Sequence, residues 1–99
     1  MYEELIEPFK LCFKYNSFLD FSKNVKTEIY EKFGRDIFEK MYKLQDDFYI
    51  VNKDVTLINH DFETVRNEVE RNFLQLYPNI CKEILDMLTV DYYYNCVMH

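Results

Sequence analysis

The scarcity of turn-forming residues most constrains how this chain can fold. Its 99 residues include one glycine and two prolines, whereas all-β domains need many tight turns, which commonly use Gly, Asn-Gly or Pro. Hydrophobic residues make up 48% of the chain, which is enough to form a core and argues against disorder. The sequence therefore predicts an all-α fold, a single helical domain over residues 1–99 in which four to five antiparallel helices form a compact bundle.

Hydrophobic residues recur at helical spacing in five segments. Intervals of three and four residues predict helices over about 5–16, 18–33, 36–50, 61–76 and 79–95. Pro8 is compatible with the first of these helices only if it lies in the first turn, where its missing N–H has no partner to lose. Gly34 follows the second helix, where a left-handed residue commonly ends a helix.

Short polar side chains predict where three of the helices begin. Ser17 and Asp20 have the spacing of a capping box, in which two side chains satisfy the first backbone N–H groups. Asp36 repeats this pattern with Glu39. Asp61 precedes the most regular of the hydrophobic stripes and is expected to be its N-cap.

Residues 48–58 are open to two interpretations. β-Branched residues on both sides of "NKD" fit a short hairpin. An isolated hairpin is only marginally stable in water, however. We favour a helix that frays near residue 50 and continues as an irregular link through Asn59.

Negative charge is concentrated in one part of the sequence. The chain has a net charge of −6, and residues 46–70 contain seven acidic residues against Lys53 and Arg66. A local field of this kind can steer a basic partner, and its sign disfavours direct binding to nucleic acid. The alternative interpretation is a solvated helix face that only keeps the protein in solution.

Tyrosines accompany these acids, and tyrosine is common at binding hot spots because it combines a large rigid ring with one hydroxyl. The candidate partner-binding residues are Asp46, Asp47, Tyr49, Asp54, Asp61, Glu63, Tyr93 and Tyr94. In the alternative interpretation Tyr49 covers the core and the acids are solvated. Helical geometry places Tyr92 on the core stripe of the last helix and Tyr93 and Tyr94 on its polar side. There the two tyrosines either lie over a neighbouring helix end or form a contact surface, such as the seam of a homodimer.

The chain shows no motif for catalysis or cofactor binding. His60 has no Cys or Asp at metal-ligand spacing, and Cys12, Cys81 and Cys96 lack the CxxC pattern, so they are expected to be reduced thiols. We therefore predict that the protein is not an enzyme and uses no cofactor and no metal.

No apolar run approaches the roughly 18 residues of a membrane span. The first residues, "MYEELIEPFK", are acidic and lack the apolar stretch of a signal peptide. The expected location is the cytoplasm, without contact to a membrane.

Two segments carry a resemblance to a known family. "DIFEKMYKLQDDFYIV" is an aromatic-bearing helix, and "INHDFETVRNEVERNFLQLY" follows it after a short acidic link. Over about residues 17–77 the chain resembles the small acidic helical immunity proteins of nuclease bacteriocins and contact-dependent inhibition toxins, of the colicin D immunity type. The resemblance implies a tight one-to-one complex with a basic RNase domain, in which acids near Asp46, Asp47, Asp54 and Asp61 take the place of substrate phosphates.

Two other functions fit the same composition. A phage-encoded inhibitor of a host defence nuclease, such as an anti-CRISPR protein that mimics nucleic acid, would also be small, acidic and non-enzymatic. It would act in a phage-infected host cell, whereas an immunity protein would act in the bacterium that makes the toxin. The third class is a structural or homodimeric helical module.

Overall fold

The computed structural model describes residues 2–13, 22–55 and 61–96, and their regular structure is helical throughout. The elements are a short 3-10 helix η1 (Glu3–Leu5), α1 (Ile6–Phe13), α2 (Lys23–Phe33), α3 (Arg35–Val51), α4 (Phe62–Leu76) and α5 (Lys82–Cys96). The predicted all-α class is confirmed. The hairpin is wrong for residues 48–55, because α3 continues to Val51 and a turn follows it; the rest of that segment lies outside the described residues.

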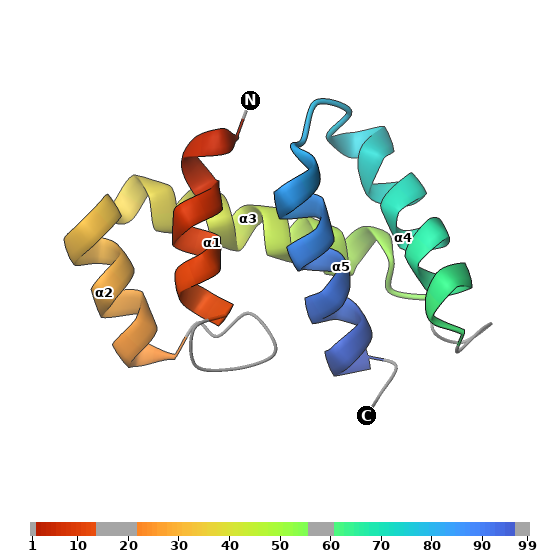
Figure 1. Ribbon diagram of the computed structural model, residues 1–99, viewed down its shortest axis with the longest axis horizontal. Helices are drawn as coiled ribbons and strands as arrows, with labels where there is room; N and C mark the ends of the chain where they lie inside the picture. Colours follow the sequence, from red (N-terminus) through yellow and green to blue (C-terminus); the bar gives the residue numbers. More distant parts are fainter. Residues whose placement is uncertain (1, 14–21, 56–60, 97–99) are drawn as a thin grey trace.

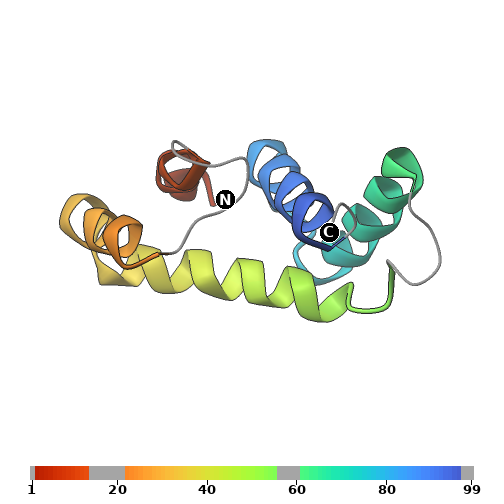
Figure 2. The same cartoon turned by 90° about the horizontal axis from the view of Figure 1, so that it is seen from below.

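Helix α3 forms one layer of the molecule, and the other four helices form a second layer across it (Figures 1 and 2). Within the upper layer α1 and α2 run in opposite directions, as do α4 and α5 (Figure 1). All four helices contact α3. The antiparallel arrangement predicted for the bundle therefore applies to the α1/α2 and α4/α5 pairs, whereas α1 and α5, which contact each other, run in the same direction, and α3 crosses beneath all four (Figure 1). Figure 2 shows no described helix on the opposite side of α3.

Three aromatic rings from three helices meet in the core. The Phe48 ring of α3 lies 5.0 Å from the Phe73 ring of α4 and 5.7 Å from the Tyr92 ring of α5, measured between ring centroids. Tyr92 is only 1% exposed, so its predicted place in the core is confirmed. Burial of a large apolar side chain contributes about 1.5–3 kcal/mol, which makes this contact a major link between the layers.

The junction between α2 and α3 differs from its predicted form. Gly34 has a positive φ of 96°, as expected, but its ψ of 161° lies outside the left-handed helical region. Its backbone N–H donates to the carbonyls of Ile29 and Tyr30, both at 3.1 Å. Because α3 begins at the next residue, Asp36 lies inside the first turn of α3 and its predicted role as a cap is wrong.

Three further predictions concern the starts of helices, and the structure confirms the cap at Asp61. Asp61 is the N-cap of α4, and its side chain accepts a hydrogen bond from the Thr64 backbone N–H at 3.1 Å, which confirms the prediction. Pro8 lies in the first turn of α1, where a proline is tolerated. The capping box of Ser17 and Asp20 lies outside the described residues.

The start of the last helix is later than predicted. α5 begins at Lys82 instead of near Asn79, because Tyr77 and the two residues after it form a turn. That turn is closed by a hydrogen bond of 3.2 Å from the Ile80 N–H to the Tyr77 carbonyl.

Candidate protein-binding face on α3

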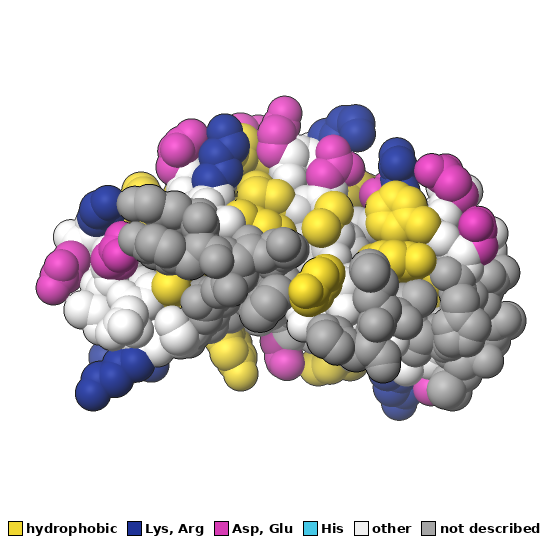
Figure 3. All heavy atoms as spheres, turned by 60° about the horizontal axis from the view of Figure 1, so that its bottom comes forward, with side chains coloured by type: hydrophobic (Ala, Val, Ile, Leu, Met, Phe, Trp, Pro, Cys, Tyr) yellow, Lys and Arg dark blue, Asp and Glu magenta, His cyan; other side chains and the backbone are white. Residues whose placement is uncertain are grey.

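The acidic residues of 46–70 do not form one continuous charged surface. Most of them have cationic neighbours at helical spacing: Lys43 lies 3.0 Å from Asp47, Arg66 lies 4.0 Å from Glu63 and 3.5 Å from Glu70, and Arg71 lies 2.5 Å from Glu68. Two of these cations, Lys43 and Arg71, lie outside the 46–70 window, so a count along the sequence overstates the local charge. On the face shown in Figure 3, acidic and basic side chains are interspersed along the upper edge.

The Asp47 carboxylate links α3 to the end of α4 and is not free for a partner. It accepts hydrogen bonds from the Tyr77 hydroxyl, 30 residues away, and from the Lys43 ammonium at 3.0 Å. Partial burial raises the pKa of Asp47, but the hydrogen bonds from Tyr77 and Lys43 outweigh it and hold the pKa below its ordinary value. Asp47 therefore joins α3 to the end of α4.

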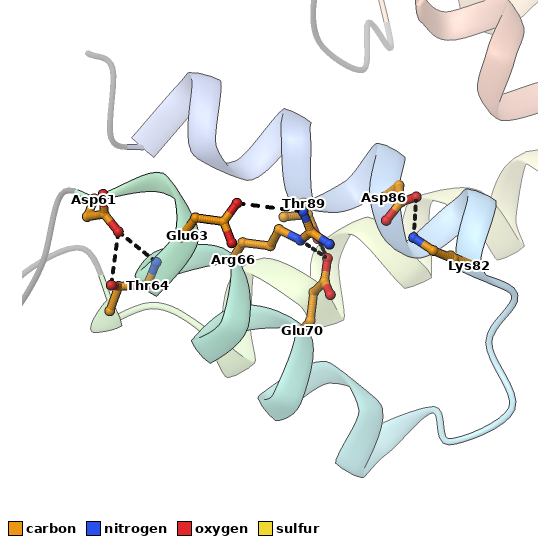
Figure 4. A network of polar contacts seen from close by, with 8 residues as sticks. All are labelled: Asp61, Glu63, Thr64, Arg66, Glu70, Lys82, Asp86 and Thr89. Atoms are coloured by element: carbon orange, nitrogen blue, oxygen red, sulfur yellow. Dashed lines mark hydrogen bonds and ion pairs between the residues drawn. The ribbon is translucent and has the colours of Figure 1, made fainter.

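Asp61 and Glu63 lie at the start of α4 (Figure 4). The Asp61 carboxylate also accepts from the Thr64 hydroxyl at 3.0 Å, so it is engaged in the cap. Glu63 is exposed and points toward Arg66, which lies between Glu63 and Glu70. Both carboxylates are exposed, but Asp61 is bonded within the cap and Glu63 is paired with Arg66.

Tyr49 lies in the interior side of α3 and not on its outer surface. Its hydroxyl donates to the Asp91 carboxylate at 2.8 Å and accepts from the Asn95 side-chain amide at 3.2 Å. Burial and the nearby Asp91 carboxylate raise the pKa of Tyr49 well above its usual value. This placement agrees with the interpretation in which Tyr49 covers the core.

Tyr93 and Tyr94 are both half-buried. The Tyr93 ring packs edge-on against Phe62 at 4.7 Å between centroids, which ties α5 to the start of α4. Val90, which precedes these tyrosines on α5, is exposed. Helix α5 contacts α3, but no hydrogen bond, ion pair or ring contact joins Tyr93 or Tyr94 to Asp46 among the described residues.

The outer side of α3 carries what remains of the predicted site. Tyr42, Asp46 and Ile50 follow one another at intervals of four residues and lie on one side of the helix; we call these three residues the α3 face. Tyr42 is 54% exposed and Ile50 is 60% exposed. Asp46 is exposed, and no other described residue forms an ion pair or hydrogen bond with its carboxylate. Sequence reasoning missed Tyr42 and Ile50, although both are large hydrophobic residues that stand off the core stripe of their helix.

The surface is hollowed at both ends of the α3 face. A shallow groove of about 600 Å³ lies between α2 and α3, and its lining includes Tyr42 and Asp46. The Lys26 ammonium lies there, 5.5 Å from the centre of the Tyr30 ring and 5.4 Å from that of Phe38. At the other end a pocket of about 340 Å³ lies between α3 and α4, beside Ile50 and Asp54.

Asn52 was missed by sequence reasoning and fixes the end of α3. Its side chain is fully buried, donating to the Phe48 carbonyl at 3.0 Å and accepting from the Asn72 amide at 3.0 Å. Its backbone carbonyl accepts a hydrogen bond of 2.5 Å from the Tyr92 hydroxyl. A polar residue just after a predicted helix is normally read as a turn, so the sequence contained no signal for burial.

Asp91 was also missed. Its carboxylate is fully buried and accepts hydrogen bonds from Tyr49 at 2.8 Å, Gln45 at 3.2 Å and Asn95 at 2.9 Å. These neutral donors satisfy the buried oxygens, which would otherwise be costly. Its position between Val90 and the tyrosines, on the apolar side of α5, was the available signal.

Two further properties concern the described residues alone. Residues 2–13, 22–55 and 61–96 contain no group of three or more His, Cys, Asp or Glu side chains arranged to hold a metal ion. None of the helices in these ranges is long and apolar enough to cross a membrane.

Comparison of the chain with protein-family models, curated proteins and solved structures gives no match. The resemblance to immunity proteins of the colicin D type therefore stays a prediction.

Proposed function

We propose that this chain is a non-enzymatic binding protein that inhibits a basic, nucleic-acid-handling protein, and that it does so through the α3 face. The observation that carries the proposal is the uncovered outer side of α3, where Tyr42 and Ile50 expose large hydrophobic surfaces on either side of the unpaired carboxylate of Asp46. Hydrophobic residues that surround a charge are typical of protein–protein contacts.

The two kinds of side chain would have different roles in the complex. Burial of Tyr42 and Ile50 would supply most of the affinity, since both lie half or more in solvent in the unbound chain. Asp46 would form a charge-assisted hydrogen bond to an Arg or Lys that otherwise contacts phosphate. The net charge of −6 would accelerate association with a positively charged surface. An immunity protein and a phage-encoded inhibitor would both work in this way.

The experiment is a parallel capture from cells of the source organism. Wild-type chain and an Asp46→Lys/Asp54→Lys variant are immobilised, and bound proteins are quantified by mass spectrometry. Asp47 and Asp61 are left unchanged because they hold helix ends together. The matched control is Glu31→Lys/Glu83→Lys, which makes the same charge change at exposed positions of α2 and α5.

The expected result is a basic protein that wild type and control retain and that the Asp46/Asp54 variant loses. The captured protein is then purified, and its nuclease activity is measured with increasing amounts of the chain. Inhibition that is complete at a one-to-one ratio supports the proposal. A captured protein that both variants retain equally, or whose activity on nucleic acid is unchanged by the chain, contradicts it.

A further inference from the structure

The pocket between α3 and α4 is continuous with the α3 face. Ile50 belongs to the face and also lines the pocket, whose volume is about 340 Å³. Its apolar walls come from Val51, Val55 and Val65. Pockets that bind small groups in proteins typically start at about 300 Å³, so this one is large enough for an aromatic or aliphatic side chain.

A buried hydrogen-bond network holds the pocket in shape. Asn52, between the lining residues Val51 and Lys53, donates to the Phe48 carbonyl at 3.0 Å and to the Val69 carbonyl at 3.4 Å. Asn72, which lines the pocket, donates to the Asn52 side chain at 3.0 Å. These bonds join the end of α3 to α4 and hold the lining residues in place. Binding of a ligand would therefore cost little conformational entropy.

The carboxylates at the edge of the pocket are not equivalent. Glu68 is paired with Arg71 at 2.5 Å. Asp54 is exposed, and no other described residue forms an ion pair with it. Lys53 also lines the pocket and is exposed. Asp54 is therefore the acidic group that is available to a cation entering beside the apolar walls.

We propose that the pocket receives a hydrophobic side chain of the partner and that Asp54 pairs with a Lys or Arg next to that side chain. The proposal rests on the proposed function, because it names the part of the basic partner that the chain recognises. Two observations select this occupant: the pocket continues the α3 face, and an apolar cavity stands beside an unpaired carboxylate. Anchor side chains in preformed pockets commonly dominate the energetics of protein interfaces.

The test uses 2-phenylethylamine, which joins an aromatic ring to an ammonium group, and the neutral analogue 2-phenylethanol. Each is titrated into the full-length ¹⁵N-labelled chain, and amide chemical shifts are followed by NMR. The expected shifts map to Val51, Val55, Thr64, Val65 and Asn72. The amine should bind about two- to five-fold more tightly than the alcohol, the range expected for an exposed ion pair.

Asp54→Asn is expected to abolish the preference for the amine, and the matched variant Asp46→Asn is expected to retain it. A pocket-filling variant, Val55→Trp, should abolish binding of both compounds, whereas Leu76→Trp, at an exposed position outside the pocket, should not. Absence of shifts in the pocket, as would follow if the chain's own residues fill it in solution, overturns the proposal. Equal affinity for amine and alcohol in the wild type overturns the assigned role of Asp54.

Failure here can be told apart from failure of the proposed function. If only the pocket proposal is wrong, neither compound binds, yet Asp46→Lys/Asp54→Lys still loses a basic nuclease in the capture experiment. If only the proposed function is wrong, both compounds still bind in the pocket, and the capture experiment finds no inhibited nucleic-acid-handling protein.

Discussion

Asn52 forms hydrogen bonds with residues of three helices. It is fully buried, and its side chain and backbone engage α3, α4 and α5 together. A buried amide whose hydrogen bonds are all satisfied favours one arrangement of the helices around it. If a partner is removed, the unsatisfied polar group destabilises the fold by its desolvation free energy. The end of α3, and with it the pocket beside Ile50, therefore depends on one side chain.

Asn52→Ala is expected to lower the free energy of unfolding by about 1–3 kcal/mol, since it leaves the partly buried Asn72 amide without its acceptor and removes the donor that Asn52 supplies to the Phe48 and Val69 carbonyls. Urea denaturation followed by circular dichroism measures the change. Asn67→Ala, at an exposed position of α4, is the control and should alter stability by less than about 0.5 kcal/mol. Equal stability of the two variants would contradict the role assigned to Asn52.

Asp47 makes a pH-dependent contribution to stability. Its folded pKa lies below the unfolded value of 3.8, so the ionised carboxylate favours folding at pH above 3.8, and this stabilisation is lost as pH falls through the folded pKa. Asp47→Asn should therefore lower Tm by a constant amount between pH 5 and 8, as that range lies above about 3.9, the ordinary pKa of an aspartate.

The difference in Tm between wild type and Asp47→Asn should shrink below pH 3.8. Thermal denaturation in a series of buffers measures it. Asp46→Asn serves as the control, because Asp46 is exposed and has no partner among the described residues. A difference that stays constant down to pH 2 would contradict this assignment.

At the scale of the elements, the helices follow from local pattern. The core residues Met41, Leu44 and Phe48 of α3, and Val65, Val69 and Phe73 of α4, stand at intervals of three and four, as the sequence predicted. Helix ends were less predictable where a cap is absent. Asp61 has a capping side chain and was placed correctly, whereas α3 starts directly after Gly34 without a side-chain cap.

Gly34 is the single residue between α2 and α3, and it has φ 96° and ψ 161°. This conformation is essentially limited to glycine, and an L-residue forced into it costs about 1–3 kcal/mol. A Cβ at Gly34 would meet no atom within 4 Å, so the cost comes from backbone strain and not from crowding.

Gly34→Ala and Gly34→Asn are both expected to lower the free energy of unfolding by about 1–3 kcal/mol. Asparagine gives partial relief only at left-handed helical positions, where ψ is near 45°. Chemical denaturation of the two variants therefore tells whether ψ of Gly34 is near 161° or in the left-handed helical region. Full recovery of stability in Gly34→Asn would show that Gly34 is an ordinary left-handed cap in solution.

At the scale of the whole molecule, the crossing of α3 beneath the other helices produces the candidate binding face. Four helices cover the inner side of α3, and the described helices leave its outer side uncovered (Figure 2). In an up-and-down bundle each helix shares its buried sides with two neighbours. Here a 17-residue helix can present a full side to a partner while its other side belongs to the core.

The complex with the captured partner is expected to weaken as salt rises, mainly through a slower association rate, because surface charges are screened within about 10 Å at 0.1 M salt. Surface plasmon resonance at several salt concentrations measures both rate constants. Asp46→Asn should reduce the salt dependence, and Glu31→Gln should change it less. Rates that do not depend on salt would argue against recognition of a basic surface.

The sequence by itself determined the all-α class, the approximate extent of the helices, the Asp61 cap and the burial of Tyr92. These properties depend on neighbours three or four residues apart, so they can be recognised in a linear pattern. The sequence also predicted an acidic region, but a count of charges along the chain could not show which carboxylates are paired with Lys or Arg side chains.

Only the tertiary structure decided that Asp47 accepts a hydrogen bond from Tyr77, that Tyr49 donates to buried Asp91, and that Asp46 stays exposed between Tyr42 and Ile50. The partners in the first two pairs lie 30 and 42 residues apart. Such contacts depend on how α3 crosses the other helices, and no helical periodicity encodes a crossing direction. The candidate face is therefore a consequence of packing, built from helices that the sequence had already predicted.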